Sequence, residues 1–118
     1  MQQSPEIHPN PTDSLLQLAT EQAEWSQQTF GTDQERGPLG ALMHLEKEAR
    51  EAQEAPDDPS EYADCLLLII DAARRAGIDI TQLLQHAHDK LEICRQRKWP
   101  KPEHPDQPVE HIREGSET

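Results

Sequence analysis

Apolar residues recur at helical spacing in four segments of the chain, and short stretches containing proline or glycine separate them. The predicted helices cover residues 14–28, 38–54, 60–76 and 80–97. Thr12 or Asp13 is expected to cap the first helix, Ser60 to cap the third and Gly77 to end the third. Because β-branched residues are few in the third segment, we predict no strand there. The pattern predicts an all-α fold, a four-helix bundle.

The third predicted helix is apolar on almost every side. Between Tyr62 and Ala76 most positions are alanine, cysteine, leucine or isoleucine, which is typical of a helix at the centre of a fold. Only 33% of the chain is hydrophobic and 3% aromatic, which is little for the core of a small self-sufficient domain. We therefore expect a homo-oligomer in which helices from different subunits complete one another's core.

The two ends of the chain differ from its middle. Residues 1–11 are polar and contain three prolines, and residues 100–118 contain four. We predict a flexible N-terminal arm at 1–11, one helical domain at 12–99 and a proline-rich tail at 100–118.

The charge balance excludes several classes of function. The formal net charge is −12 at pH 7, and such a surface repels the backbone of DNA or RNA. A single nucleotide is still possible, since divalent cations bridge carboxylates to phosphates. No apolar stretch is long enough to cross a membrane, and the N-terminus lacks signal-peptide character. Cys65 and Cys94 form no metal-binding motif, and we expect reduced thiols in a cytoplasmic protein.

Four acidic residues form the main candidate site. Glu48 and Glu51 are three residues apart on the second predicted helix, and Glu61 and Asp64 have the same spacing on the third. This spacing puts each pair on one helical face, and the short turn between the helices makes them antiparallel, so that the pairs can face each other. Two carboxylates about 4 Å apart repel by roughly 4 kcal/mol at an effective dielectric near 20. Bound divalent cations remove the repulsion, and oxygen-only ligands favour Mg²⁺, Mn²⁺ or Ca²⁺ over zinc.

The same acids can also be the solvated faces of two surface helices, because glutamates at this spacing are common. The position of Asp64 favours a site, since the most apolar run of the chain follows it directly. Asp71 lies two turns further on inside that run, where an acid is costly unless it is paired. It is about 10 Å from Asp64 along the helix, too far to share an ion. We expect Arg74, Arg75 or Lys90 to pair with it.

Several motifs surround the four acids. They are Trp25-Ser26, Thr29-Phe30-Gly31, Arg36-Gly37-Pro38, His44-Leu45, Lys47-Glu48, Glu61-Tyr62-Ala63-Asp64, Asp71 to Gly77, Lys90-Leu91, Arg97 to Pro100 and Pro108 to Arg113. Taken together over residues 24–113, they resemble the MazG-like all-α nucleoside triphosphate pyrophosphohydrolases, and in particular their dATP/dGTP diphosphohydrolase branch.

The resemblance implies hydrolysis of a purine (deoxy)nucleoside triphosphate between the α and β phosphates. It favours dGTP, with dATP or GTP as further substrates, and a phage origin. The cofactor is expected to be Mg²⁺ or Mn²⁺, with two or more ions held by Glu48, Glu51, Glu61 and Asp64. Glu48, Glu51 and Lys47 are the expected catalytic residues. A homotetramer arranged as a dimer of dimers is the expected assembly.

The chain departs from the family pattern at two positions. Lys47 stands where many relatives have glutamate, and it cannot bind a cation. It is expected to meet a phosphate, or else to be a surface partner of Glu51. Cys94 stands where relatives often have asparagine, so a polar contact to the nucleotide is lost if that asparagine makes one.

The candidate substrate-binding residues are Lys90, Arg97, Trp25, Arg36 and Lys47. Lys90 and Arg97 share one face of the last predicted helix and suit the distal phosphates. The alternative is that these basic residues near the C-terminal end of the helix interact favourably with the helix dipole. Arg36 lies in a loop as a possible phosphate contact. Trp25 suits stacking on a purine, but packing in a core or interface is the alternative.

Three functions stay open on this basis. The first is a purine deoxynucleoside triphosphate diphosphohydrolase, and the second is a house-cleaning enzyme for other or modified nucleotides. The third is a non-catalytic acidic helical protein, such as a DNA mimic. A mimic spreads its acids over one long face, whereas here several are concentrated on two adjacent helices at matched spacing, which favours a site.

Overall fold

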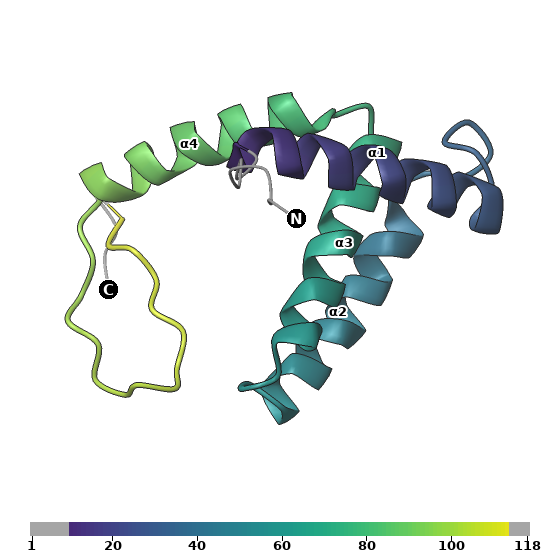
Figure 1. Ribbon diagram of the computed structural model, residues 1–118. Coiled ribbons are helices and arrows are strands. Elements are labelled where there is room, and N and C mark those ends of the chain that lie inside the picture. The colour runs from purple at the N-terminus through teal and green to yellow at the C-terminus, as the bar shows by residue number, and fades with distance from the viewer. Residues whose placement is uncertain (1–9, 114–118) are drawn as a thin grey trace, which may run out of the picture. The chain divides into compact units, whose positions relative to one another are not determined.

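The computed structural model describes residues 10–113. Over this range it contains four helices and no β-strand, which confirms the predicted all-α fold. They are α1 (Pro11–Phe30), α2 (Leu39–Glu54), α3 (Pro59–Arg75) and α4 (Ile80–Gln96) (Figure 1). The chain forms two compact units with the boundary between Leu83 and Leu84, so that α1, α2 and α3 belong to the first and most of α4 to the second.

The helix α1 begins three residues before its predicted start and ends two residues later. Asn10 caps it in place of Thr12 or Asp13, because the Asn10 side-chain oxygen accepts a hydrogen bond from the backbone N–H of Thr12 at 2.8 Å. Pro11 is the first helical residue, a position where its missing N–H is not needed. The last two residues of the predicted N-terminal arm therefore belong to the start of α1, and the rest of that arm lies outside the described residues.

The helix α3 also starts before its predicted cap. Asp58 is the cap, and its carboxylate accepts hydrogen bonds from the backbone N–H of Ser60 at 2.9 Å and from the Ser60 hydroxyl at 2.7 Å. These bonds lower the pKa of Asp58. Gly77 follows the helix as predicted, with a φ of 86° that favours glycine.

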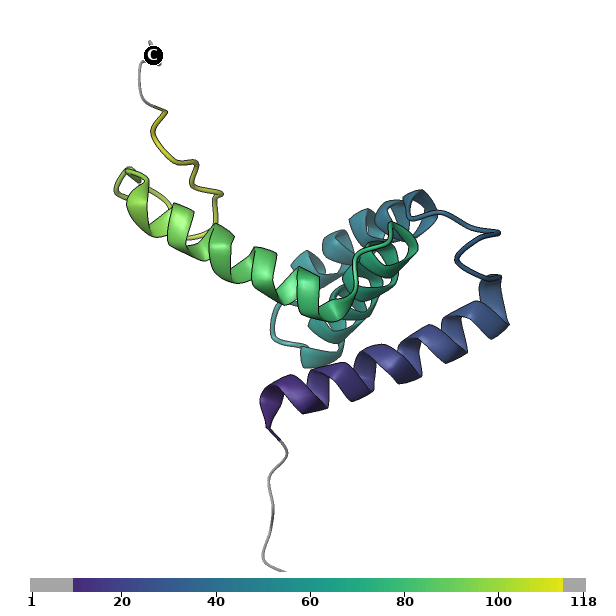
Figure 2. The same ribbon diagram turned by 90° about the horizontal axis from the view of Figure 1, so that it is seen from above.

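The helices α2 and α3 form an antiparallel hairpin in the first unit, and α1 packs across α3 (Figures 1 and 2). The apolar core of this unit is small. Its buried hydrophobic side chains are Ala41, Ile70 and Ala72. On α3, Leu66 is 47% exposed and Ile69 is 38% exposed, so α3 is not buried on every side within the single chain.

Buried polar side chains join α1 to α3. Asp71 on α3 accepts hydrogen bonds from Gln22 at 2.9 Å and Ser26 at 2.6 Å, both on α1. It also accepts one from Arg74 at 2.7 Å and one from Arg75 at 3.0 Å. The predicted pairing of Asp71 with a neighbouring arginine is confirmed, and it involves both arginines.

The second unit contains most of α4 and the chain that follows it. The indole N–H of Trp99 donates to the carbonyl of Cys94 at 2.7 Å. The backbone N–H of Ile112 donates to the carbonyl of Lys98 at 2.7 Å, in an isolated antiparallel bridge. The proline-rich tail therefore returns to the end of α4. None of the helices in residues 10–113 has the length and apolar character that crossing a bilayer requires.

Candidate metal centre

Three of the four predicted acids lie together at the closed end of the α2–α3 hairpin. Glu48 and Glu51 come from the last turns of α2, and Glu61 comes from the first turn of α3. Each offers one carboxylate oxygen, and these oxygens lie within 4.8 Å of one another. The turn between the helices is only four residues long, which is why Glu61 on α3 meets the two glutamates of α2.

The electrostatics of this group fit a bound cation. One oxygen of Glu48 and one of Glu61 are buried, and neither has a hydrogen-bond partner among the described residues. The pKa of Glu51 is raised, first by a hydrogen bond with the Glu48 carboxyl and then by the negative charge of Glu48. Burial and then the nearby acids raise the pKa of Glu61. Unpaired oxygens and mutual repulsion are both relieved by a divalent ion with oxygen ligands.

Asp64 and Lys47 lie at the edge of this group. Asp64 is exposed, one helical turn after Glu61, and it is not among the three acids whose oxygens converge. It lines a neighbouring cavity together with Glu48. Lys47 is exposed on α2, and its positive charge acts against the raised pKa of Glu51. The metal role of Asp64 and the catalytic role of Lys47 stay predictions.

The neighbouring cavity, about 220 Å³ in volume, lies between the acids and α1. Trp25 and Phe30 contribute two aromatic walls, with their ring centroids 5.4 Å apart and their planes at 89°. His44 also lines the cavity, and its Nε2 lies 3.0 Å from a Glu48 oxygen. Trp25 is 58% exposed, so its ring is accessible to a ligand rather than part of the core. An aromatic wall beside acids suits a base next to its metal-bound phosphates.

Arg36 lies beside the same aromatic wall. Its guanidinium carbon is 5.8 Å from the centre of the Phe30 ring. Phe30, Arg36 and His44 line a further small cavity next to Gly40. A Cβ atom at Gly40 would meet the Arg36 guanidinium at 2.9 Å, so the absence of a side chain there allows Arg36 its position.

A buried arginine holds the loop that carries Arg36. The Nη1 atom of Arg75 donates to the carbonyls of Gly31 at 3.1 Å, Thr32 at 3.3 Å and Arg36 at 3.4 Å. Its Nη2 atom donates to the Ser26 hydroxyl at 2.9 Å. Sequence reasoning missed this role of Arg75. The one local signal for Arg75 was an arginine four residues after a buried acid.

Arg74 completes the network on its outer side. Its guanidinium donates to Asp33 at 3.0 Å and to Asp71 at 2.7 Å, and it also contacts Gln22. Burial acts to lower the pKa of Arg74, but the bonds to the two acids outweigh it and raise the pKa. The guanidinium is therefore fully charged and ties the loop to both helices.

Lys90 and Arg97, the remaining predicted substrate-binding residues, belong to the second unit. Lys90 is exposed on α4, and Arg97 is half-buried just beyond its end. Their contact with the phosphates stays a prediction.

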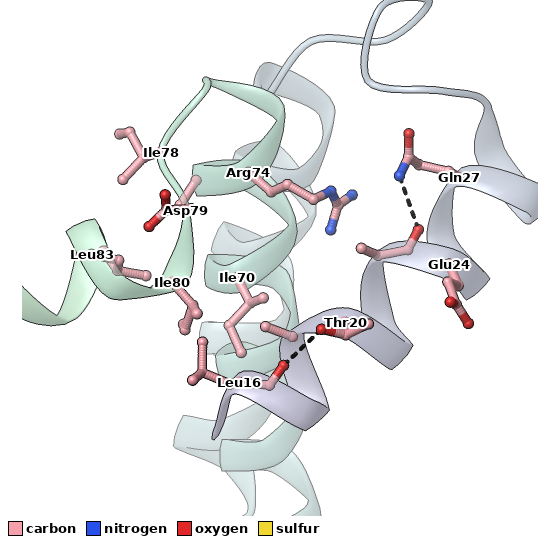
Figure 3. Close-up of a pocket in the computed structure, with 13 residues that line it drawn as sticks. Leu16, Thr20, Glu24, Gln27, Ile70, Arg74, Ile78, Asp79, Ile80 and Leu83 are labelled. Atoms are coloured by element: carbon pink, nitrogen blue, oxygen red, sulfur yellow. Dashed lines mark hydrogen bonds between the residues drawn. The ribbon is translucent and has the colours of Figure 1, made fainter. Parts of the chain in front are cut away.

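A second cavity in the first unit, about 320 Å³, has a different character (Figure 3). It lies between α1, the C-terminal part of α3 and residues 78–83, with Leu16, Ile70 and Ile80 in its walls. The Thr20 hydroxyl at its edge donates to the Leu16 carbonyl at 3.0 Å, within α1. This mainly apolar cavity offers no arrangement of groups for a reaction.

The chain is similar to one known protein family and to two individual phage proteins. The family model of dATP/dGTP pyrophosphohydrolases matches residues 18–118. The chain is 43% identical over 108 residues to the Eaa protein of Salmonella phage P22, a match that covers 92% of this chain and 33% of that protein. It therefore spans about a third of the length of this relative. It is also 33% identical over 88 residues to the dATP/dGTP diphosphohydrolase of Cyanophage S-2L, covering 73% of this chain and 78% of that one.

A solved structure supports the same fold. It is the MazG-like pyrophosphohydrolase of Cyanophage S-2L, bound to dGDP and three catalytic Mn²⁺ ions per active site. The TM-score is 0.64 at 30% sequence identity, and the match covers 89% of this chain and 100% of that chain. The MazG-like fold predicted from the sequence is confirmed.

Proposed function

The chain belongs to the dATP/dGTP pyrophosphohydrolase family, and from this premise we propose that it hydrolyses purine deoxynucleoside triphosphates, with dGTP preferred, to the monophosphate and diphosphate. The observation that carries the proposal is the convergence of Glu48, Glu51 and Glu61 beside an aromatic cavity. The S-2L structure, with dGDP and Mn²⁺ in its active site, supports both the substrate class and the cofactor.

In this proposal Glu48, Glu51, Glu61 and Asp64 hold Mg²⁺ or Mn²⁺, with two or more ions per site. When bound, the ions would neutralise the phosphate oxygens and activate water for attack at the reacting phosphorus. The first three acids fit this role because two of their buried oxygens have no hydrogen-bond partner among the described residues. Asp64 joins them from the next turn of α3 and from the shared cavity wall.

The remaining side chains bind and orient the substrate. The neighbouring Glu48 carboxyl raises the pKa of Glu51, and in this proposal the pair takes the proton lost by the attacking water. His44 contacts Glu48 and fixes its carboxylate. The purine lies against Trp25, and Arg36 and Lys47 meet phosphates, Arg36 through its planar guanidinium and Lys47 as a point charge on a flexible side chain.

We propose a homotetramer arranged as a dimer of dimers, acting in the cytoplasm of a phage-infected host. The exposed Leu66 and Ile69 on α3 and the apolar cavity between α1 and α3 support an assembly in which another copy covers these surfaces. Size-exclusion chromatography with light scattering measures the assembly directly, and a monomer at micromolar concentration contradicts it.

The test of the activity is a panel of nucleoside triphosphates with Mg²⁺ or Mn²⁺, with diphosphate release as the readout. Glu51→Gln and Asp64→Asn are expected to lower kcat by at least about a hundredfold, since each removes a charged ligand. Glu46→Gln is the matched control, because Glu46 is exposed on the same helix and pairs with Arg50 at 3.0 Å.

The panel also separates the alternatives. Release of diphosphate mainly from pyrimidine or oxidised nucleotides refutes the purine preference but keeps the reaction. No diphosphate from any nucleotide refutes the enzymatic function. Full activity in both Glu51→Gln and Asp64→Asn refutes the assignment of the metal ligands.

A further inference from the structure

A basic cavity lies in the second unit, where the tail returns to the end of α4. Its volume is about 430 Å³. Four of its seven lining residues have basic side chains, and the others are a glutamine and two isoleucines. The basic residues are Arg97, Lys98, His111 and Arg113. Among residues 10–113 no carboxylate lines this cavity, although the chain as a whole has a formal net charge of −12.

The pairing of the tail with the end of α4 builds the cavity. The antiparallel bridge joins Lys98 to Ile112. In this register Trp99 is opposite His111, and their rings pack edge to face with centroids 5.8 Å apart. The indole N–H of Trp99 is itself held by the Cys94 carbonyl. The imidazole of His111 is therefore positioned by a fixed ring rather than left free in solvent.

Arg97 and Arg113 are each next to a partner of this bridge in the sequence, and both line the cavity. Like charges gathered around one cavity repel one another. Among residues 10–113, the ion pairs do not include Arg97, Lys98 or Arg113. The repulsion among the positive charges of the cavity is thus not offset by a described carboxylate, and a bound anion would offset it.

We propose that this cavity binds phosphate groups. Guanidinium groups bind phosphate oxygens through pairs of charge-assisted hydrogen bonds, and lysine adds a point charge. Arg97 was a predicted phosphate contact, whereas Lys98, His111 and Arg113 are added by the folded tail. The phosphates come either from the nucleoside triphosphate or from the diphosphate product. This link to a nucleotide rests on the proposed function, but the anion site does not.

The first experiment titrates the full chain with inorganic diphosphate, without divalent ions and at about 0.15 M salt, by isothermal titration calorimetry. Without metal the acidic cluster repels the anion, so saturable binding reports the basic cavity. Arg113→Gln and Lys98→Gln are each expected to weaken binding about tenfold or more, as for the loss of a charge-assisted bond. Arg95→Gln is the matched control, because Arg95 lies on α4 outside the cavity and pairs with Glu92.

No saturable binding to the wild-type chain overturns the proposal, as does equal affinity in Arg113→Gln and Arg95→Gln. Circular dichroism of each variant shows whether the fold is kept. Because Arg113 and Lys98 are exposed, their substitution is expected to leave the helices intact.

Steady-state kinetics with dGTP and Mn²⁺ then identify the source of the phosphates. A KM raised about tenfold in Arg113→Gln, with kcat little changed, assigns the site to the substrate. An unchanged KM with about tenfold weaker inhibition by diphosphate assigns it to the product. If the wild-type chain hydrolyses no nucleotide, the proposed function fails, and the diphosphate titration still decides whether the cavity binds phosphate.

Discussion

Replacing Asp71 with asparagine removes the negative charge at the centre of the buried network between α1 and α3. Four donors lie 2.6 to 3.0 Å from its carboxylate oxygens. The side chain of Arg75 is only 1% exposed, so the substitution leaves a buried positive charge with less compensation. Breaking a buried ion pair typically costs about 3–5 kcal/mol. Asp33 lies 3.5 Å from Arg75 and 3.0 Å from Arg74, so we expect the lower end, about 3 kcal/mol.

The assay is urea unfolding at pH 7, followed by circular dichroism at one fixed protein concentration. Asp89→Asn is the matched control, because Asp89 is exposed and accepts only a hydrogen bond from Gln85 one turn away. We expect it to change the free energy of unfolding by less than about 0.5 kcal/mol. If Asp71→Asn costs less than about 1 kcal/mol, the network does not stabilise the packing of α1 on α3 and the reasoning is refuted.

The pH dependence of the same two proteins is a second check. Burial is the largest single influence on Asp71 and acts to raise its pKa, but the hydrogen bonds from Ser26, Gln22, Arg74 and Arg75 together hold the pKa well below its usual value. The ionised carboxylate therefore stabilises the fold at pH values above the unfolded pKa of about 3.9. This contribution is lost as the pH falls from there through the folded pKa. The difference between the unfolding free energies of wild type and Asp71→Asn should shrink as the pH falls below about 4. A difference that does not change with pH contradicts this.

Four further outcomes are expected. Mn²⁺ at about a hundred times its dissociation constant should stabilise the fold by about 2.7 kcal/mol in thermal unfolding, and a chelator should reverse this; an equal shift in Glu61→Gln argues against the acidic site. Trp25→Ala should raise the KM for dGTP about tenfold with little change in kcat, as for loss of a stacking contact, and an unchanged KM argues against stacking. Gly40→Ala should displace the Arg36 guanidinium and raise the KM for dGTP without loss of helix stability. An unchanged KM argues against a contact between Arg36 and the substrate. Gly77→Ala should cost about 1 kcal/mol in urea unfolding because of its positive φ, and a neutral effect contradicts the strain.

The helices could be predicted because their signal is local. Apolar spacing located all four helices. The largest displacement is at the start of α1, where several residues able to cap stand close together. Asn10 and Asp58 each precede a proline that begins the helix, and this pairing is a more specific signal than Thr12 or Ser60 alone. The meeting of the acids was predictable because a four-residue turn leaves two helices little freedom.

The cavities and the loop contacts could not be predicted in the same way. Arg75 reaches backbone carbonyls about 40 residues earlier in the chain, and nothing in the spacing of an arginine specifies that partner. The return of Ile112 to Lys98 is likewise a single long-range contact in a proline-rich segment. Lys90 was a candidate partner for Asp71 because both are on helices, but the neighbouring arginines take that place.

The closed end of the α2–α3 hairpin joins ion binding to local opening of the backbone. The turn is held by backbone hydrogen bonds, among them that from Asp58 N–H to the Ala55 carbonyl at 3.0 Å, and by the Tyr62 hydroxyl, which donates to the Pro56 carbonyl at 2.8 Å. If Glu51 and Glu61 hold ions as proposed, those ions cross-link the two helices beside that turn, and any fraying of the hairpin tip must first release them. Amide hydrogen exchange at residues 55–61 should therefore slow with ion occupancy while distant helices stay unchanged. Amide exchange of this turn therefore measures ion occupancy of the acidic site without a nucleotide and without turnover.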